Sequence, residues 1–299
     1  MFEGSIVALV TPMFGAEAGG DKAGAIDFSS LEALIEWHIE SGTHGIVPTG
    51  TTGESATLTP DEHMDVIKRT VDVVAGRVPV IAGTGANSTA EAIKYTVEAE
   101  KRGADACLLV TPYYNRPPQE GMVQHYQAVA SAVELPLLLY NVPPRTASDL
   151  LPDTVARLAE VPNIVGIKEA CGDAERVGAI RSRVPDDFCV LGGEDAQNHR
   201  MMELGARGAI SVTANVLPAK MAAFCNAWLA GDSEAAAALD AELQETHRLL
   251  FIEPSPMPTK WALSRMGRIQ GGIRLPLITL SEQGASELGA HLDSIGALS

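Results

Sequence analysis

The residue of this sequence best suited to covalent chemistry is a lysine that ends an apolar run. Lys168 closes the segment Ile164–Lys168 and precedes a Gly172-Asp173 pair that could start a helix. A lysine in water has a pKa of about 10.4, but an amine among apolar neighbours loses its proton more easily. Such an amine can attack a carbonyl and form a Schiff base, through which carbon–carbon bonds form or break. The alternative is that Lys168 ends a strand and extends its ammonium group to water.

Tyrosines follow two other apolar runs. Of five tyrosines, Tyr113 and Tyr114 come after the run 104–110, and Tyr140 ends the run 135–140. If the runs around Tyr140 and Lys168 form neighbouring strands, the phenol and the amine meet above one opening. The phenol could then move the protons that carbinolamine formation and dehydration require. The alternative is that these rings anchor loops as half-buried packing.

Further polar groups lie at the ends of other runs. The loop after the run 45–48 holds Thr51, Thr52 and Ser55 among glycines, so its hydroxyls and N–H groups could bind a carboxylate, although a polar turn explains them equally. Arg145 offers a planar fork for a carboxylate, or a surface ion pair. At the ends of the last two runs, Leu191-Gly-Gly193 and Gly208-Ala-Ile210 let a ligand approach the backbone closely.

The elements that must position these groups alternate along the chain. Continuous apolarity, without a polar alternate face, is typical of parallel strands covered by helices on both sides. Eight alternations of strand and helix favour a closed (β/α)8 TIM barrel over an open sheet, with the site at the C-terminal ends of the strands. The predicted strands are residues 5–10, 45–48, 78–82, 104–110, 135–140, 164–168, 188–191 and 209–212.

Helix-start signals separate the runs. Thr59-Pro60-Asp61-Glu62 combines an N-cap, a proline at N1 and a glutamate at N3, and Ser29-x-x-Glu32 and Ser88-x-x-Glu91 resemble capping boxes. After the last run the pattern is helix without strand. We therefore expect a barrel over residues 1–225 and a C-terminal helical region packed on it over residues 226–299. Predicted later helices are 119–133, 152–160, 173–184, 195–204, 218–229, 233–250, 256–266 and 281–295.

Composition excludes several classes of partner. The 299 residues are 46% hydrophobic and carry a net charge of −16, with lysines and arginines scattered, so nucleic acid and anionic membranes are poor partners. The first ten residues lack a basic leader, and no apolar stretch approaches about 18 residues, which predicts a cytoplasmic location. The four cysteines are far apart and lack CxxC spacing, which indicates buried reduced thiols rather than zinc ligands or disulfides.

Three motifs in register resemble one known family. Gly50-Thr-Thr-Gly-Glu-Ser55, Thr111-Pro-Tyr-Tyr-Asn-Arg-Pro117 and Tyr140-Asn-Val-Pro-Pro-Arg-Thr146, together with Lys168, are similar to the pyruvate-dependent class I aldolases of the dihydrodipicolinate synthase and N-acetylneuraminate lyase superfamily. Within it, they resemble the 4-hydroxy-tetrahydrodipicolinate synthase family of bacterial lysine (diaminopimelate) biosynthesis. The resemblance spans the whole chain.

The resemblance implies a role for each matching position. Lys168 would form the imine with pyruvate. Thr51, Tyr140 and Tyr114 would relay protons, with Tyr114 supplied across a dimer interface by the neighbouring subunit. Thr52, Gly193 and Ile210 would help to hold pyruvate, and Arg145 would bind the carboxylate of L-aspartate semialdehyde. The resemblance also implies a homotetramer built from tight dimers, and a reaction without a metal or organic cofactor.

Members of such families are often inhibited by L-lysine in a cleft between subunits. The matching positions are Ser55, Ala56, His63, Asn87, Glu91 and Tyr113. Pro60 departs from the histidine that lysine-sensitive bacterial members tend to carry, so we expect weak or altered inhibition. The alternatives are that Glu91 caps its own helix and that His63 faces solvent.

Two other functions compete with this prediction. A sister aldolase acting on a sugar acid or on 4-hydroxy-2-oxoglutarate would use the same Lys168 chemistry, but Arg145 favours an acceptor with an amino acid carboxylate. A non-catalytic keto-acid sensor would not require Lys168, Tyr140 and Thr51 together. Failure of borohydride and pyruvate to add mass at Lys168 would favour the sensor.

Overall fold

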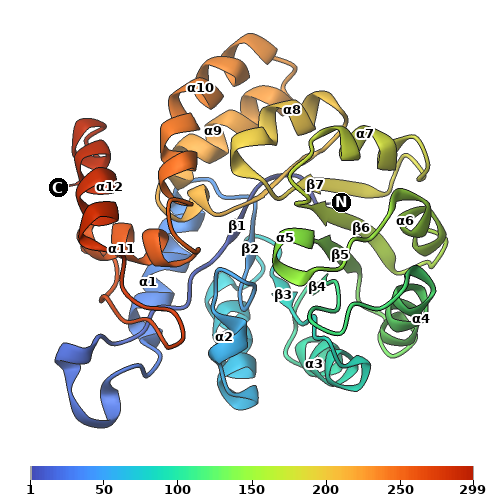
Figure 1. Ribbon diagram of the computed structural model, residues 1–299, viewed down its shortest axis with the longest axis horizontal. Helices are drawn as coiled ribbons and strands as arrows, with labels where there is room; N and C mark the ends of the chain where they lie inside the picture. The colour runs from blue at the N-terminus through green and yellow to red at the C-terminus, as the bar shows by residue number, and fades with distance from the viewer. Residues whose placement is uncertain (1, 299) are drawn as a thin grey trace.

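The protein is a ring of eight parallel strands surrounded by helices (Figure 1). The computed structural model describes residues 2–298. Neighbouring strands pair in parallel in the order β2-β1-β8-β7-β6-β5-β4-β3, and a parallel bridge between Ile46 and Val80 joins the two ends. The predicted (β/α)8 barrel is therefore confirmed. The strands are β1 Gly4–Ala8, β2 Gly45–Val47, β3 Ile81–Gly83, β4 Ala106–Val110, β5 Leu137–Asn141, β6 Ile164–Glu169, β7 Cys189–Gly192 and β8 Gly208–Ser211.

Helices follow each strand and continue beyond the ring. Two short helices, α5 and α6, follow β5, and α10, α11 and α12 come after the last barrel helix, α9. The helices are α1 Phe28–Glu40, α2 Pro60–Val74, α3 Thr89–Lys101, α4 Gln119–Ala130, α5 Pro143–Thr146, α6 Pro152–Leu158, α7 Glu175–Arg181, α8 Asn198–Glu203, α9 Pro218–Leu229, α10 Ser233–Leu249, α11 Met257–Arg265 and α12 Glu282–Ser294.

Helix starts follow the sequence signals in part. The capping box at Thr59 and Glu62 is confirmed, with each side chain bonded to the other residue's backbone N–H. The signal at Ser29 was wrong, because Asp27 caps α1 by accepting a hydrogen bond from Ser30. Ser88 occupies the N-cap of α3, but among the described residues its hydroxyl caps none of the N–H groups of the helix.

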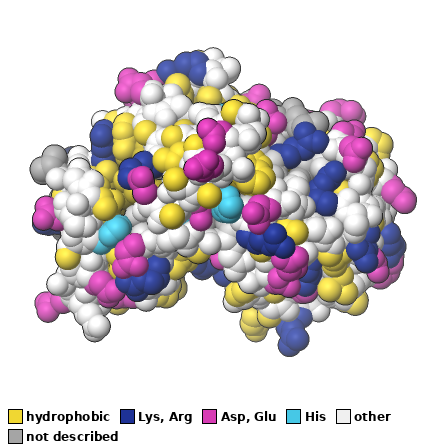
Figure 2. Space-filling view, turned by 90° about the horizontal axis from the view of Figure 1, so that it is seen from above, with side chains coloured by type: hydrophobic (Ala, Val, Ile, Leu, Met, Phe, Trp, Pro, Cys, Tyr) yellow, Lys and Arg dark blue, Asp and Glu magenta, His cyan; other side chains and the backbone are white. Residues whose placement is uncertain are grey.

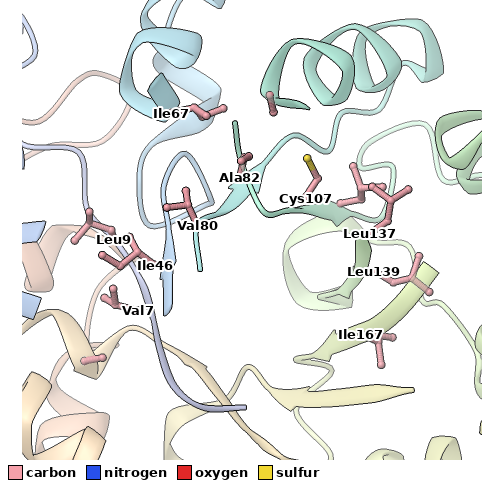
Figure 3. Packing of buried hydrophobic residues seen from close by; sticks show 14 of the residues in the cluster. Val7, Leu9, Ile46, Ile67, Val80, Ala82, Cys107, Leu137, Leu139 and Ile167 are labelled. Carbon is pink, nitrogen blue, oxygen red and sulfur yellow. The ribbon is translucent and has the colours of Figure 1, made fainter. Parts of the chain in front are cut away.

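The barrel core has an inner and an outer layer because successive side chains of a strand point to opposite faces. An inner cluster includes Ile6, Leu138, Tyr140, Leu191 and Ile210. The outer layer packs alternate strand residues against the helices, as Figure 3 shows. Burying each large side chain contributes roughly 1.5–3 kcal/mol, so the two layers together hold the strand ends in place. Residues labelled in Figure 3 are Val7, Leu9, Ile46, Ile67, Val80, Ala82, Cys107, Leu137, Leu139 and Ile167.

The C-terminal helices form a smaller layer with an apolar cluster of their own. Leu249 and Leu250 at the end of α10 pack with Ala262 of α11 and with Leu288 and Leu292 of α12. The predicted division at residues 225 and 226 falls within α9, and we propose the end of α9 as its position; residues 1 and 299 lie outside the described range. Within residues 2–298, every helix is too short or too polar to cross a membrane.

Candidate active site

Lys168 and Tyr140 lie opposite each other inside the mouth of the barrel. The register pairs Tyr140 of β5 with Lys168 of β6, and Lys168 with Leu191 of β7. Tyr140 and Leu191 belong to the inner cluster, so Lys168 also points into the barrel. Its nitrogen lies 4.5 Å from the centre of the Tyr140 ring, and the two residues are 5% and 7% exposed. The alternative of a solvated lysine at a strand end is wrong.

Gly193 leaves the space that the lysine side chain occupies. A Cβ atom at this position would stand 2.7 Å from Lys168 Cε and 2.8 Å from the Ala170 side chain. Its N–H donates to Glu169 O at 2.8 Å, which fixes the end of β7 against the end of β6. Glycine is therefore required for the close approach of this backbone to the lysine. Ile210, the other predicted backbone contact, lies in the inner cluster on β8.

The hydroxyl-rich loop lies beside the tyrosine. Thr51 and Tyr140 line one small cavity of about 30 Å³ at the ends of the strands. Thr52 is buried, 4% exposed. Several hydrogen bonds hold this loop, including those from Glu54 N to Thr51 O at 3.1 Å and from Thr11 Oγ1 to Gly53 O at 2.7 Å. The structure thus brings the Thr51 loop, Tyr140 and Lys168 to one end of the barrel.

A larger cavity of about 530 Å³ opens beside these groups. Thr51 and Arg145 line it, and so do Pro60 and most of the positions predicted for lysine inhibition. Asn87 is not among its lining residues, but its side-chain amide donates to Tyr113 O at 3.1 Å. Thr51 and Arg145 therefore share one continuous space with most of the predicted inhibitor positions. The predicted inhibitor positions on its wall are Ser55, Ala56, His63, Glu91 and Tyr113.

Tyr114 is separated from the other relay residues within this chain. Its side chain is 90% exposed, and its φ of 74° is unusual for a residue other than glycine. It lines neither of the two cavities described above. A single chain therefore does not place Tyr114 beside Lys168.

Glu194 is a polar residue of the mouth that was not among the predicted site residues. Burial is the main cause that raises the pKa of its carboxyl, and the negative charge of Asp195 raises it further. The positive charges of Lys168 and Arg145 lower it. Glu194 is therefore within electrostatic reach of both the proposed nucleophile and the proposed carboxylate-binding arginine. Its place directly after Gly193, at the end of a strand, is the signal that could have indicated it.

A buried carboxylate also lies on the outer side of the same two strands. Asn141 Nδ2 donates to both carboxylate oxygens of Glu169 at 3.1 Å, one position beyond the Tyr140–Lys168 pair. Burial raises the pKa of Glu169 to about 7, against hydrogen bonds from Asn141 and Cys171 that lower it. Glu169 directly follows the lysine in the sequence, but no sequence pattern indicated Asn141 as its hydrogen-bond partner. Cys171, expected to be buried, is partly exposed.

The wall of the larger cavity carries a histidine and two tyrosines near one glutamate. His63 is 3% exposed and bonds to Gly83 O at 2.7 Å, so the alternative of a solvent-facing histidine is wrong. Burial lowers its pKa, and its ring stacks on Tyr95 at 4.8 Å. Burial and the Glu91 carboxylate raise the pKa of Tyr95 and Tyr113. These groups offer hydrogen bonds and one negative charge to a ligand.

Charges elsewhere on the surface are mixed in sign. Figure 2 shows acidic and basic side chains interspersed over the face it presents. Exposed ion pairs of the protein include those of Arg248 with Glu245 and with Glu287. Within residues 2–298, no group of three or more His, Cys, Asp or Glu side chains is arranged to hold a metal ion.

Comparison with known proteins settles the family. The model of the dihydrodipicolinate synthetase family matches residues 1–295. This chain belongs to that family. It is 57% identical to the 4-hydroxy-tetrahydrodipicolinate synthase of Alcanivorax borkumensis, over 100% of this chain and 99% of the relative, and 53% identical to that of Pseudomonas aeruginosa, over 100% of both.

Solved structures give the same result. A chloride-inhibited dihydrodipicolinate synthase from Acinetobacter baumannii, complexed with pyruvate, is 51% identical with a TM-score of 0.96, over 100% of both chains. The enzyme from Aquifex aeolicus is 41% identical with a TM-score of 0.95, over 99% of both chains. The family and the enzyme class predicted from the motifs, and the barrel predicted from the alternating strands and helices, are therefore confirmed.

Proposed function

We propose that this protein condenses pyruvate with L-aspartate semialdehyde through a Schiff base on Lys168, the 4-hydroxy-tetrahydrodipicolinate synthase reaction of lysine biosynthesis. The observation that carries the proposal is the amine of Lys168 buried in the barrel mouth over the ring of Tyr140. An amine that is shielded from water and lies beside a phenol is suited to forming an imine with a small keto acid. The names of the curated relatives support the choice of reaction.

Imine formation requires two proton transfers. The Lys168 nitrogen attacks the C2 carbonyl of pyruvate to give a carbinolamine, and water then leaves as the imine forms. Tyr140 would move the proton between the carbinolamine oxygen and its surroundings, and Thr51 shares a cavity with it. Positioned acids and bases of this kind contribute about 10²–10⁴-fold to a rate. Tyr114 of a neighbouring subunit would complete the relay, since within this chain Tyr114 faces outward.

Carbon–carbon bond formation follows from the imine. Loss of a methyl proton converts the imine to an enamine, whose terminal carbon attacks the aldehyde carbon of L-aspartate semialdehyde. The aldehyde oxygen takes up a proton and becomes the 4-hydroxyl group. The amino group of the semialdehyde then attacks the imine carbon, closes the ring and releases Lys168 as the free amine.

Substrate binding uses the remaining groups of the mouth. Gly193 lies against the end of the lysine side chain, and together with Thr52 and Ile210 it would hold pyruvate, partly through backbone groups. Arg145 lines the larger cavity and would bind the carboxylate of the semialdehyde as a two-point contact. The aldose acceptor of a sugar-acid aldolase lacks an amino acid carboxylate for this role, which favours the synthase over such a sister aldolase.

The oligomer and the location belong to the same proposal. A second copy must bring Tyr114 to the mouth of the first, so a dimer is the minimal complete enzyme, and we propose a tetramer of two such dimers in the cytoplasm. Size measurement in solution tests the tetramer. A monomer with full activity would show that Tyr114 of a partner is not needed.

The most direct test is mass analysis after borohydride trapping. Wild-type protein incubated with pyruvate and borohydride should gain the mass of one reduced pyruvate adduct, located on Lys168, and Lys168→Arg should gain none. No adduct on the wild type would favour the keto-acid sensor. Turnover of pyruvate with L-aspartate semialdehyde, compared with cleavage of sugar acids and 4-hydroxy-2-oxoglutarate, separates the synthase from its sister aldolases.

A further inference from the structure

A buried ion pair joins the loop of Thr51 to the C-terminal helices. The carboxylate of Glu54, in the loop after β2, contacts the ammonium of Lys260 on α11, 206 residues further along the chain. The two side chains are 1% and 3% exposed. The other carboxylate oxygen of Glu54 accepts a hydrogen bond from Arg274 N at 3.2 Å. The C-terminal region therefore holds this loop through both oxygens of one carboxylate.

The position of Glu54 is coupled to that of Thr51 through the backbone. Glu54 N donates to Thr51 O at 3.1 Å, so the two residues close one tight turn. Glu54 has a φ of 56°, in the left-handed region that residues other than glycine rarely adopt. Such a conformation persists only where its surroundings impose it. The contacts with Lys260 and Arg274 are surroundings of this kind.

The C-terminal region also forms part of the wall of the larger cavity. Pro254, Ser255, Pro276 and Leu277 line the same space as Thr51. Lys260 lies in sequence between these two segments, and its ammonium contacts Glu54, which also lines the larger cavity. The segments that flank α11 thus form part of the cavity wall, and α11 itself holds the Thr51 loop through Lys260.

A pair of buried charges is a poor way to gain stability alone. Removing two ions from water costs free energy that their attraction does not always recover, and apolar residues of similar shape often stabilise as well or better. Burial lowers the pKa of Lys260, and the Glu54 carboxylate acts in the opposite direction. A fully buried ion pair does, however, fix the distance and orientation between its two charged groups, and apolar packing fixes these less sharply. That property suits a residue that positions a catalytic group.

We propose that Lys260 is a positioning residue for the proton relay: through Glu54 and the turn that Glu54 closes, it holds the Thr51 hydroxyl beside Tyr140. This inference rests on the proposed function, since it assigns the C-terminal helices a part in the same reaction. Lys260 itself does not line either cavity that holds Thr51. Its effect on the reaction would therefore pass through its partner Glu54, which lines the larger cavity and whose N–H bonds to Thr51 O.

A double-mutant cycle tests this coupling. Lys260→Met should lower kcat about tenfold or more, because a misplaced relay group loses part of its catalytic contribution, with the KM for pyruvate changed by less than about threefold. In a Thr51→Val background, Lys260→Met should lower kcat by less than about twofold further, since the group it positions is already gone. A purely structural role would instead multiply the two losses.

Matched variants separate positioning from folding. Lys220→Met breaks the exposed pair between Lys220 and Glu242 and should leave kcat unchanged in both backgrounds. Glu54→Gln with Lys260→Met removes both charges and leaves no buried ion unpaired, so this variant replaces the single one if Lys260→Met does not fold. It too should lose kcat with intact thermal stability. Wild-type kcat in a folded Lys260 variant, or equal losses in the two backgrounds, overturns the inference.

Borohydride trapping distinguishes the two possible failures. If wild-type protein gains no pyruvate adduct on Lys168, the proposed function itself is wrong. If the adduct forms and the cycle shows no coupling between Lys260 and Thr51, only the positioning role is wrong.

Discussion

Tyr140 and Lys168 are direct partners across β5 and β6, and the lysine nitrogen lies 4.5 Å from the centre of the tyrosine ring. Both side chains belong to the inside of the barrel, where water is largely excluded. The pairing follows from strand register alone, because residues opposite each other in a parallel sheet point to the same face. The fold therefore supplies both the amine and the phenol without a loop rearrangement.

Removal of the Tyr140 hydroxyl tests the relay. Tyr140→Phe keeps the ring beside the lysine and should lower kcat by about 10²–10⁴-fold, because the proton transfers lose their positioned acid and base. Tyr126→Phe is the matched control: Tyr126 is also buried and donates to Leu109 O at 3.3 Å, on the outer side of the barrel. That change should cost about 1 kcal/mol of stability and leave kcat intact. Steady-state rates and thermal unfolding of both variants measure the difference, and an unchanged kcat in Tyr140→Phe would contradict the relay.

The absence of a side chain at Gly193 should be required for the position of Lys168. Gly193→Ala places a methyl group 2.7 Å from Lys168 Cε, so the lysine must move away from its position over Tyr140. We expect at least about a tenfold loss of kcat/KM for pyruvate, in line with the effect of displacing a reacting group by about 1 Å. Gly178→Ala, in α7, meets its nearest neighbour at 3.5 Å and serves as control with full activity. Rapid trapping of pyruvate by Gly193→Ala at the wild-type rate would refute the steric argument.

Local patterns account for the part of the site that the sequence predicted. The apolar runs located the strand ends, and strand ends in a closed barrel converge, so Lys168, Tyr140 and Thr51 could be placed together before any coordinates. Arg145 was found in the same way, from its place just beyond Tyr140. The strand register observed in the structure then shows which of these side chains share the inner face of the barrel.

Contacts between distant segments could not be predicted in this way. Glu54 and Lys260 are 206 residues apart, and the sequence around each gives no sign of the other. The capping of α1 by Asp27 rather than Ser29 was a choice between two candidates, two residues apart, that differ little in N-cap propensity. The family resemblance implied that Tyr114 serves a neighbouring subunit, but local propensity does not predict the left-handed backbone that this residue adopts.

Acid stability should depend on the pair between Glu62 and Arg274. The hydrogen bond from Arg274 is the main cause that lowers the pKa of Glu62 from 4.5 to about 2. A carboxyl with a depressed pKa in the folded state stabilises the fold above the unfolded pKa, and this contribution is lost as pH falls through the folded value. The melting temperature of wild type should therefore exceed that of Glu62→Gln by a constant amount above pH 4.5 and lose this excess between pH 4.5 and about 2.

The choice of glutamine isolates the charge in this experiment. Glutamine preserves the capping box with Thr59, so the helix start is unchanged. Glu282→Gln, at an exposed position in the first turn of α12, should follow wild type at every pH. An excess for wild type over Glu62→Gln that persists undiminished at pH 2 would show that the carboxylate charge is not the cause.

Pro60 should decide the response to L-lysine. It begins α2 and lines the larger cavity together with His63 and Glu91, where it presents a ring without a hydrogen-bonding group. We expect weak inhibition of the wild type by L-lysine. In Pro60→His, the half-inhibitory concentration should be at least about tenfold lower, because one hydrogen bond to a charged ligand contributes about 1.5–3 kcal/mol. Asp61→His, at the next and exposed position outside the cavity lining, is the control and should match wild type. Full inhibition of the wild type at low L-lysine would show that Pro60 does not limit binding.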